Sequence, residues 1–482
     1  MPWTRALLAL SSGGLLDLAF PPHDAWWLAP IAVALLLVVI RDQSRKAGAW
    51  LGLVHGLGFF APLLVWTSAT AGTAPWLALA LLEAAFLALL GWALAAISGL
   101  RGWPVWAALL WVAEEALRDR FPFGGFPWGR LAFSQGHTPL TPLAAMGGAP
   151  LVTLGVAAVG AALASRPLLN RSPALLLAPL LVLLALVWPT PHDGPTTQVA
   201  VIQGNVPRLG LPRADQQRAV LNNHVKATHD LAAAVRAGRL PQPALVIWPE
   251  NASDVDPYTD ATAYQSIDAA VRDVGVPVLV GAVTAGPGDK VSNRGIVWDP
   301  RTGAGASYVK RHPVPFGEYI PFRSLVRHIT SRVDLVPSDF ASGKTVGALR
   351  VGPVVVGDVI CFEVAYDGIV HDVVTAGGQL IVVQTNNATF GRSGETSQQL
   401  AMGRLRAVEH GRSLIVAATS GVSAVLTPEG GVQHRTRILT QDVTVQPVTL
   451  RTGTTLATRL GWWPELVMTL LALIGLWRGV RR

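Results

Sequence analysis

Three positions in the chain carry residues that together could perform acyl-transfer chemistry. The apolar run 244–248 leads into Glu250, and the apolar run 353–360 leads into Cys361. Lys310 stands between them in the chain. A thiol that attacks a carbonyl carbon needs a base to take its proton, and the oxyanion that forms needs a cation or N–H donors. A carboxyl, an ammonium and a thiol group therefore form one candidate set for chemistry with a nucleophilic cysteine.

Cys361 is the only cysteine among the 482 residues. A lone cysteine is usually a buried and inert apolar residue, so its type alone says little. Its position at the end of an apolar run favours a nucleophilic role, for which His312 and His371 are alternative bases that the sequence does not link to it. With one cysteine and no HExxH motif or cluster of ligands, we expect neither a metal site nor a cofactor.

The elements that must position these residues alternate along 196–450, where no internal repeat is evident. Runs rich in β-branched residues predict strands at 198–203, 244–248, 276–283, 292–298, 353–360, 380–384, 414–418 and 422–426. Helical segments separate several of them, at 214–237, 261–274, 366–376 and 396–410. Nearly continuous apolar strands indicate a sheet covered on both faces, so we predict one layered α/β domain.

Apolar segments flank this domain in the sequence. Charged residues make up 14% of the chain and hydrophobic residues 51%, whereas an ordinary soluble protein has about 25% charged residues. The deficit lies in residues 1–190, a predicted membrane domain of seven helices, and in 460–479, a predicted C-terminal transmembrane helix. Because a span needs about 20 apolar residues, we predict about eight, near 5–20, 25–40, 47–67, 76–98, 104–118, 139–164, 173–189 and 460–478.

Basic residues between the spans predict the orientation of the chain. Loops 21–24 and 68–75 contain no Lys or Arg, and segment 118–138 departs from the pattern with three arginines. Since cytoplasmic loops are enriched in Lys and Arg, we expect both termini in the cytoplasm and the α/β domain outside it. The net charge of +8 then reports orientation and not nucleic-acid binding. The residues that follow the even-numbered spans are Arg41, Arg45, Lys46, Arg101, Arg166, Arg171, Arg478, Arg481 and Arg482.

Several features within the apolar segments allow further predictions. Gly52 and Gly56 form a small-xxx-small pair, which is typical of close helix packing. Glu83 lies in the middle of a predicted span, where it indicates either a polar cavity or a hydrogen-bonded packing residue. Segment 121–136 is rich in Gly, Pro and aromatic residues, so we expect a loop on the outer membrane surface.

Further motifs accompany the three candidate residues in chain order: Gln203-Gly204-Asn205, Trp248-Pro249-Glu250, Val314-Pro315-Phe316-Gly317-Glu318-Tyr319, Gly357-Asp358 before Cys361-Phe362-Glu363, and Thr385-Asn386-Asn387. This series resembles the Glu–Lys–Cys pattern of the nitrilase superfamily. With hydrophobic spans on both sides, the whole chain is similar to the membrane branch of that superfamily, the apolipoprotein N-acyltransferases, which complete bacterial lipoprotein maturation. Two departures are Phe362, where the family often has Tyr, and Asn387-Ala388-Thr389-Phe390-Gly391, where it often has Asp-x-Trp-Phe-Gly.

The resemblance implies a fold and a reaction. The α/β domain would be a nitrilase-like αββα sandwich, with Cys361 as the nucleophile, Glu250 as the general base and Lys310 as the stabiliser of the tetrahedral intermediate. Cys361 would take an acyl chain from a phospholipid as a thioester. The α-amino group of an apolipoprotein's S-diacylglyceryl-cysteine would then accept it. The protein would act as a monomer in the bacterial cytoplasmic (inner) membrane, without a cofactor and without nucleic acid.

The resemblance also implies supporting residues around these three. Glu318 would orient Lys310 or the incoming amine, while Asn293, Phe362 and Glu363 would shape the site or contact substrate. Other functions remain open from the residues alone. A membrane-anchored nitrilase-like amidase would use the same residues with water as the acceptor, whereas a non-catalytic membrane scaffold for a glycosyltransferase, or a transporter, would not need them.

Overall fold

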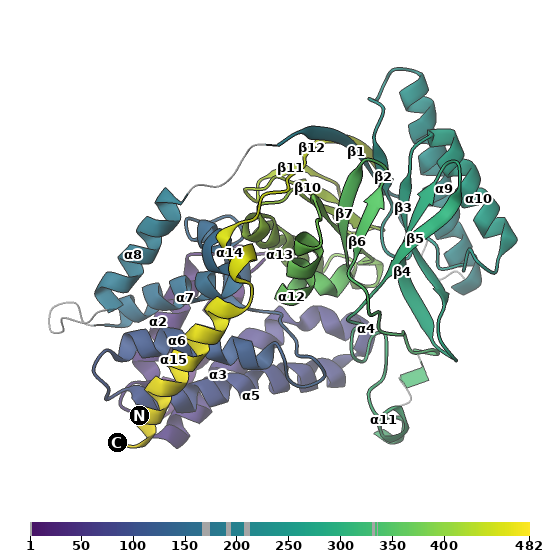
Figure 1. Cartoon of the computed structure of the whole chain (residues 1–482). Coiled ribbons are helices and arrows are strands. Elements are labelled where there is room, and N and C mark those ends of the chain that lie inside the picture. Colours follow the sequence, from purple (N-terminus) through teal and green to yellow (C-terminus); the bar gives the residue numbers. More distant parts are fainter. Residues whose placement is uncertain (1, 166–173, 189–193, 207–212, 330–332, 335) are drawn as a thin grey trace. The chain divides into compact units, whose positions relative to one another are not determined.

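The computed structural model describes residues 2–165, 174–188, 194–206, 213–329, 333–334 and 336–482. The chain forms two compact units (Figure 1), of which unit 1 comprises Met1–Thr190 and Thr454–Arg482 and unit 2 comprises Pro191–Gly453. Arg166 and Arg171, which contributed to the predicted orientation, lie outside the described residues.

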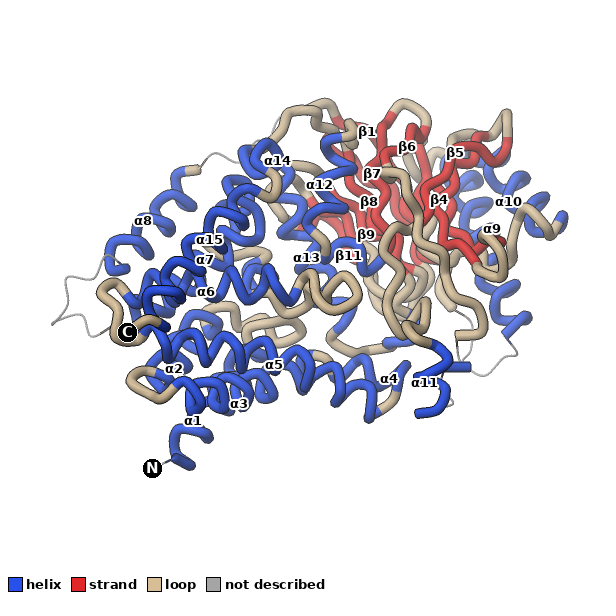
Figure 2. Tube along the Cα trace, turned by 60° about the horizontal axis from the view of Figure 1, so that its bottom comes forward, coloured by secondary structure: helices blue, strands red, loops and turns tan. Residues whose placement is uncertain are grey.

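Unit 2 contains two six-stranded sheets, drawn in red in Figure 2. The first runs in the order β12 (Asp442–Thr449), β1 (Thr196–Gln203), β2 (Leu245–Ile247), β3 (Val278–Ala285), β4 (Val291–Asp299) and β5 (Gly303–Val309). The second runs in the order β11 (Val432–Arg435), β10 (Ala424–Leu426), β9 (Leu414–Ala418), β8 (Leu380–Thr385), β7 (Val354–Ile360) and β6 (Ala348–Val351). Strands β1-β2-β3 and β7-β8-β9 are parallel, and the other pairs are antiparallel.

Helices cover the outer faces of both sheets. Helices α9 (Arg213–Arg236) and α10 (Ala261–Val274) pack on the first sheet, and α12 (Asp367–Thr375) and α13 (Glu395–His410) pack on the second. A short helix, α11 (Arg323–Ile329), lies in the connection between β5 and β6. This layering confirms the predicted nitrilase-like α/β sandwich, and it explains why the strands read as continuous apolar runs, since both faces of each sheet are covered.

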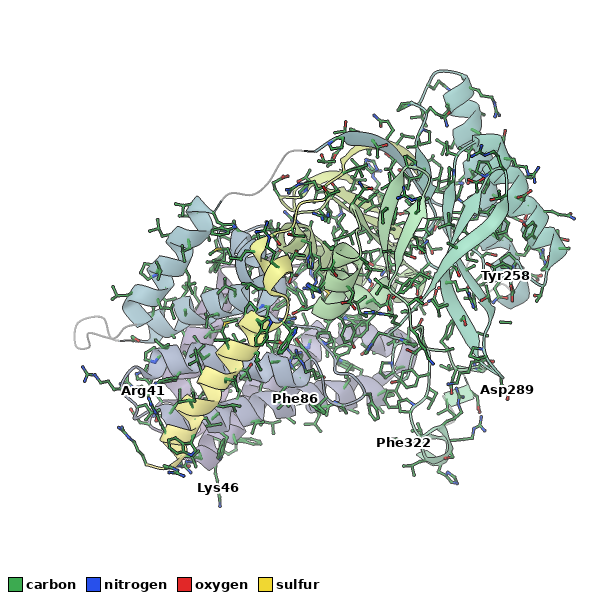
Figure 3. The ribbon with its side chains drawn as sticks, in the orientation of Figure 1. Arg41, Lys46, Phe86, Tyr258, Asp289 and Phe322 are labelled. Carbon is green, nitrogen blue, oxygen red and sulfur yellow. The ribbon has the colours of Figure 1, made fainter. Side chains whose placement is uncertain are left out.

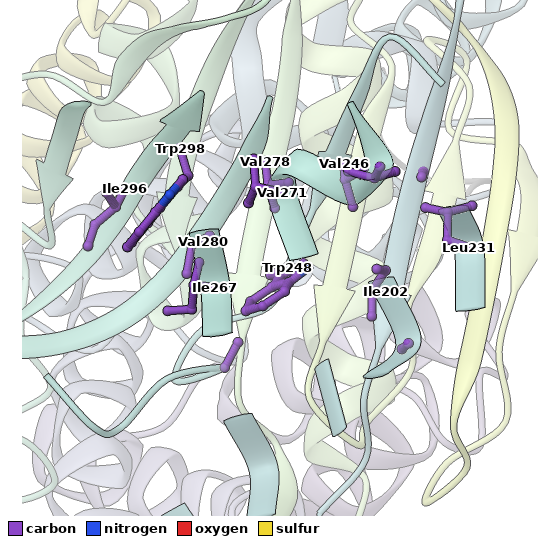
Figure 4. Close-up of a cluster of buried hydrophobic side chains, with 14 of the residues drawn as sticks. Ile202, Leu231, Val246, Trp248, Ile267, Val271, Val278, Val280, Ile296 and Trp298 are labelled. Atoms are coloured by element: carbon purple, nitrogen blue, oxygen red, sulfur yellow. The ribbon is translucent and has the colours of Figure 1, made fainter. Parts of the chain in front are cut away.

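Strand β1 shows how one apolar run serves two cores. Val199 and Val201 belong to the cluster between the sheets, whereas Ala200 and Ile202 belong to the cluster between the first sheet and its helices. Successive side chains of a strand point to opposite faces, so the run divides residue by residue. Figure 4 shows the helix-side cluster, in which Trp248 is fully buried, so the backbone that leads from β2 to Glu250 starts from a fixed anchor.

Unit 1 is helical, and each predicted span contains a helix. Among the described residues, only Thr73–Ile97, Thr141–Ala164 and Trp463–Val480 are long and apolar enough to cross a membrane. The helix 45–63 with the helical turns that follow it, bent by 54°, would make a fourth span, so the eight-span bundle is not confirmed. The elements are α1 (Pro2–Leu18), α2 (Leu28–Ile40), α3 (Arg45–Leu63), η1 (Val65–Thr67), α4 (Ser68–Ala71), α5 (Thr73–Ile97), α6 (Trp103–Arg118), η2 (Leu131–Gln135), η3 (Thr141–Leu143), α7 (Ala144–Ala164), α8 (Ala174–Val187), α14 (Leu456–Leu460) and α15 (Trp463–Val480).

The small residues of α3 lie against α5, as their spacing predicted. A Cβ added at Gly52 would stand 2.1 Å from the carbonyl oxygen of Leu87, and one added at Gly56 would stand 2.7 Å from Ala84 Cα. Both distances are far below a normal contact, so only glycine allows the two backbones to approach this closely.

Glu83 is buried in unit 1 and is bound by an arginine. Arg118 Nη1 lies 3.3 Å from Glu83 Oε2, and Arg118 Nε lies 3.0 Å from Glu114 Oε1. All three side chains are buried. This contact fits the hydrogen-bonded packing residue that the sequence suggested as one of two interpretations, because a buried charge requires a hydrogen-bonded partner.

The prediction for segment 121–136 is wrong in its second half. Phe121 and Phe123 are exposed, but residues 127–135 are buried in unit 1 and end in η2. Arg130 Nε lies 3.5 Å from Glu115 Oε2 and 3.3 Å from Asp119 Oδ2. These ion pairs hold the segment in the interior, because the arginine would otherwise be buried without a partner.

Candidate active site

The three residues predicted to perform the chemistry lie together in unit 2. Glu250 follows β2, Lys310 follows β5 and Cys361 follows β7. Lys310 Nζ lies 3.3 Å from Glu250 Oε1. Burial raises the pKa of the Cys361 thiol well above its usual range, Glu250 raises it further and Lys310 opposes the rise. The thiol is thus within electrostatic reach of both charged groups.

Hydrogen bonds between the two sheets hold the strand ends in place at this site. The Gln384 side chain, on β8, donates from Nε2 to the carbonyl oxygen of Trp248 at 2.6 Å. The backbone N–H of Asn386 donates to Glu250 Oε2 at 2.8 Å, and the Thr419 hydroxyl donates to the backbone oxygen of Glu250 at 2.8 Å. Glu250 is therefore fixed from the second sheet as well as from its own strand.

The carboxylate of Glu250 is buried and hydrogen-bonded on both oxygens. Besides the contacts with Lys310 and Asn386, its Oε1 accepts a hydrogen bond from Asn293 Nδ2 at 2.6 Å. Burial raises the pKa of Glu250 above 4.5, although Lys310 and these donors limit the rise. A carboxyl with a raised pKa holds a proton more readily than an ordinary one, which suits a group that must take and return a proton.

Lys310 is buried between two carboxylates. Its Nζ donates to Glu318 Oε1 at 2.9 Å and to Glu250 at the longer distance given above. Burial lowers the pKa of Lys310, but Glu318 and Glu250 outweigh that effect and hold it well above its usual value. Lys310 is therefore a permanent cation. Among the residues that the structure describes, no group of three His, Cys, Asp or Glu side chains is placed to hold a metal ion.

Cys361 stands at a strained turn between β7 and a 3-10 helix, η5 (Cys361–Ala365). Its φ of +54° is uncommon for a residue with a side chain, and Asn251 and Phe316, also close to the site in sequence, have φ values of +56° and +62°. Such conformations cost free energy and collect at functional sites. Cys361 is half-buried as a residue, and Gln399 Nε2 donates to its Sγ at 3.7 Å.

Glu363 connects the segments that carry Lys310 and Cys361. It is fully buried, and its carboxylate accepts hydrogen bonds from the Tyr308 hydroxyl at 2.8 Å and from three backbone N–H groups, of Arg311, His312 and Ile360, at 2.7, 3.0 and 2.9 Å. These donors occupy the carboxylate, so of the two implied roles its geometry fits the shaping of the site and not a substrate contact.

The remaining predicted residues lie around this centre. Phe362 is buried with its ring 5.4 Å from that of Tyr366, edge to face, which also shapes the turn after Cys361. The ring centroid of His312 lies 4.0 Å from that of Tyr366, with the rings tilted by 39°, and burial together with Lys310 lowers the pKa of His312 to about 4. His371, on α12, lies beside Asp372. Glu250, and neither histidine, is thus the base candidate that the contacts support.

Four polar residues near Cys361 received no role from the sequence, although two of them stand in the motif Thr385-Asn386-Asn387. They are Thr385 at the end of β8, Asn387 after it, and Glu395 and Gln399 in α13, and all are buried. The stretch 395–399 reads as a solvated helix start, because its residues are polar. They are buried because α13 packs near the end of β8, where the Thr385 hydroxyl bonds to Gln399. The sequence of neither segment predicts this contact.

Comparisons with known proteins agree with this architecture. The family model described as "Apolipoprotein N-acyltransferase N-terminal domain" matches residues 12–162, and the model described as "Carbon-nitrogen hydrolase" matches residues 198–456. The apolipoprotein N-acyltransferase of Mycolicibacterium smegmatis is 40% identical over 97% of this chain and 84% of its own length. That of Azotobacter vinelandii is 32% identical over 100% of this chain and 96% of its own.

Among solved structures, an amidase from Nesterenkonia sp. is 19% identical and covers 55% of this chain and 94% of its own, with a TM-score of 0.39. That similarity is too low to carry an assignment. The family models and the relatives, in contrast, extend over both units. The chain therefore belongs to the apolipoprotein N-acyltransferase family, a bacterial family of membrane enzymes within the carbon-nitrogen hydrolases.

Proposed function

We propose that this protein transfers an acyl chain from a phospholipid, through a thioester on Cys361, to the α-amino group of the S-diacylglyceryl-cysteine of apolipoproteins. Family membership supports lipoprotein N-acylation. The observation that carries the assignment of residues is the buried pair of Glu250 and Lys310 within electrostatic reach of the only cysteine.

In the first step the thiol of Cys361 attacks the ester carbonyl of the phospholipid. Glu250 takes the proton from sulfur as the S–C bond forms, and the carbonyl π electrons move onto oxygen. Lys310 and a backbone N–H after Cys361 stabilise this oxyanion. The intermediate then expels the alcohol oxygen of the lysophospholipid, which receives the proton from Glu250. The acyl chain remains on sulfur as a thioester.

In the second step the α-amino group of the lipoprotein attacks the thioester carbonyl. Glu250 accepts a proton from the amine, an amide bond forms, and the departing sulfur of Cys361 recovers that proton. Lys310 stabilises the second oxyanion as it did the first, and its raised pKa keeps it charged throughout. Glu318 holds Lys310 in place, because it is the closer of the two carboxylates to Nζ.

The membrane arrangement is part of the same proposal. A seven-helix domain over 1–190 and a C-terminal helix over 460–479, eight spans in all, would place both termini in the cytoplasm and the α/β domain, 196–450, on the extracytoplasmic side of the membrane, as a monomer. The long apolar helices and the distribution of basic residues support this orientation. Both substrates are lipids, so an enzyme embedded beside them avoids extracting either one into water.

The proposal is tested by mass spectrometry of the purified full-length protein after incubation with phospholipid. We expect an adduct of one fatty acyl mass on Cys361 that hydroxylamine removes, and no adduct on Cys361→Ala. A diacylglyceryl lipopeptide added afterwards should take up the acyl chain. If Cys361→Ala acylates the lipopeptide as fast as the wild type, the thioester route is wrong. Release of free fatty acid in place of acylated lipopeptide would instead indicate hydrolysis, as in an amidase.

A further inference from the structure

A second set of polar side chains reaches Cys361, separate from Glu250 and Lys310. Gln399 Nε2 donates to Cys361 Sγ at 3.7 Å, and Gln399 Oε1 accepts hydrogen bonds from the Thr385 hydroxyl at 3.0 Å and from Asn387 Nδ2 at 3.1 Å. Asn387 Nδ2 also donates to Glu395 Oε2 at 2.7 Å. The set therefore forms a chain of hydrogen bonds that starts at a carboxyl and ends at the thiol.

The direction of this chain is set by the acceptor at its start. An ionised carboxylate can only accept hydrogen bonds, so Glu395 requires the N–H₂ end of the Asn387 amide. That end also serves Gln399 Oε1, which leaves the Gln399 N–H₂ group facing sulfur. If the Asn387 amide were rotated by 180°, its oxygen would face Gln399 Oε1, and two acceptors would repel each other. Gln399 would then reverse too and present an oxygen to a sulfur that gains negative charge during attack.

The carbonyl oxygen of Asn387 gains no hydrogen bond from this orientation in the part of the chain that the structure describes. Asn387 Oδ1 is buried and has no hydrogen-bond partner among the described residues. It lies against Gly421, where an added Cβ would stand 2.5 Å from it. A buried carbonyl without a donor is unfavourable, so the amide keeps this orientation because the two acceptors opposite its nitrogen outweigh that cost.

We propose that Glu395 is a positioning residue for the nucleophile: it fixes two amides in series, so that Gln399 directs an N–H at Cys361 Sγ. This inference rests on the proposed role of Cys361. Position 387 is also where the chain departs from the family pattern, with Asn in place of the frequent Asp. An Asp at position 387 would place two carboxylates within hydrogen-bond distance of each other, where they would repel. The carboxyl group of Glu395 therefore requires an amide at position 387.

The charge of Glu395 changes near neutral pH. Burial raises its pKa to about 7, hydrogen bonds from Asn387 and Thr396 limit the rise, and Glu250 adds to it. The titratable groups that face this set are Glu250, which carries Lys310 beside it, and the Cys361 thiol itself. As pH rises through about 7, Glu395 becomes acceptor-only and locks the amides, whereas its protonated form also has an O–H donor and allows either orientation.

Two possible roles of Glu395 therefore predict opposite pH effects. As a bare negative charge, ionised Glu395 raises the pKa of Cys361 and would slow attack by the thiol. As a positioning residue it speeds attack, because the Gln399 N–H stabilises charge on sulfur. The two roles can therefore be distinguished by whether Glu395 slows or speeds the reaction of Cys361 above neutral pH.

The test is the rate constant for alkylation of Cys361 by iodoacetamide in the full-length protein, across about pH 5.5 to 8.5, a range that brackets the titration of Glu395. Glu395→Gln has the same shape but no charge at any pH. We expect the ratio of wild-type to variant rate constants to rise from about one at the acidic end to about ten at the alkaline end, since tenfold corresponds to one pKa unit. Asp289→Asn, an exposed carboxyl that points away from unit 2 (Figure 3), should give a ratio of one throughout.

A ratio that falls with rising pH, or stays constant, would overturn the proposal, because the first result indicates a bare charge and the second a packing role. A misfolded fraction of a variant reacts in a separate kinetic phase, so the comparison uses the rate constant of the phase whose amplitude matches the folded fraction measured by circular dichroism. Alkylation requires no lipid. A failure of the proposed acyl transfer would therefore be seen in the mass-spectrometric assay and not in this one.

A double-mutant cycle tests whether Glu395 acts through Gln399. Gln399→Met removes the N–H donor to sulfur, so adding Glu395→Gln to it should slow alkylation no further. If the two losses multiply, Glu395 acts by another route and the proposal fails. The exchange Asn387→Asp with Glu395→Gln keeps one carboxyl and one amide but reverses their order, so it should stay slow, and recovery to the wild-type rate would also overturn the proposal.

Discussion

At the scale of single residues, the site depends on how three charged groups share one buried environment. Lys310 lies between Glu318 at 2.9 Å and Glu250 at 3.3 Å. Burial raises the pKa of Glu250, the Lys310 cation lowers it, and the Glu318 carboxylate raises it again. Glu318 thus contributes to the basicity of Glu250 without touching the reacting atoms.

Asn293 should set the acidic limit of the reaction. Its side chain donates a hydrogen bond to ionised Glu250, which lowers the pKa of that carboxyl. In Asn293→Leu the bond is lost, so the pKa of Glu250 rises further and less of it is ionised at low pH. We expect the acidic limb of acyl-enzyme formation to move up by about one pH unit in single-turnover assays. Asn222→Leu, an exposed position, should leave the limb unchanged, and so would Asn293→Leu if Glu250 were not the base.

At the scale of elements, the two sheets must approach closely where they carry the site. Asp358 on β7 and Gln384 on β8 both face Gly295 on β4, where an added Cβ would stand 2.0 Å from Asp358 Oδ2 and 2.7 Å from Gln384 Oε1. Burial raises the pKa of Asp358 well above its usual value. Gln384 in turn holds the backbone before Glu250, so this contact connects sheet packing to the position of the base.

Gly295→Ala should therefore destabilise unit 2. Overpacking of this kind costs about 1–3 kcal/mol, which corresponds to roughly 2–12 °C in the melting temperature of a domain of this size. The matched control is Gly305→Ala on the neighbouring strand β5, whose Cβ would meet its nearest atom, the oxygen of Val297, at an ordinary 3.5 Å. Thermal melting of both variants in detergent measures the difference. Equal melting temperatures would show that the sheets have room at Gly295 and that the contact is not limiting.

At the scale of the whole molecule, the chain interrupts a helical unit with an α/β unit. Unit 1 takes its last helices from Thr454–Arg482, after the chain has completed unit 2. A single membrane topology must therefore place the basic residues before and after the α/β unit on the same side of the membrane. Basic residues stand in both parts of unit 1, with Arg41, Arg45 and Lys46 before the insertion and three arginines from Arg478 onward after it, so the same orientation rule applies to both.

Reporter fusions test this topology. An alkaline phosphatase inserted in the exposed turn 286–290 should be active, because that enzyme requires export, and one fused after residue 482 should be inactive. A fusion in the basic turn 41–45 serves as the cytoplasmic control. The opposite pattern would place the α/β unit in the cytoplasm and would separate it from the outer-leaflet lipids that the proposed reaction needs.

The sequence by itself determined the features that depend on local composition. Continuous apolar runs predicted buried strands, and Glu250 and Cys361 stood where such runs end. The family resemblance predicted the αββα sandwich. It could be found in the sequence because each of its motifs consists of consecutive residues. The Gly52 and Gly56 spacing predicted helix packing for the same reason, since residues one turn apart share a helix face.

Only the tertiary structure decided which polar groups are buried and what satisfies them. Residues 127–135 belong to a segment whose Gly, Pro and aromatic residues suggested a surface loop, yet they are buried and Arg130 forms ion pairs with Glu115 and Asp119. Glu395 and Gln399 look like a solvated helix start, yet Gln399 donates directly to the thiol and Glu395 is connected to Gln399 through Asn387. Apolar burial follows from composition, whereas burial of a polar group depends on partners from remote segments. Those partners meet only when the chain has folded.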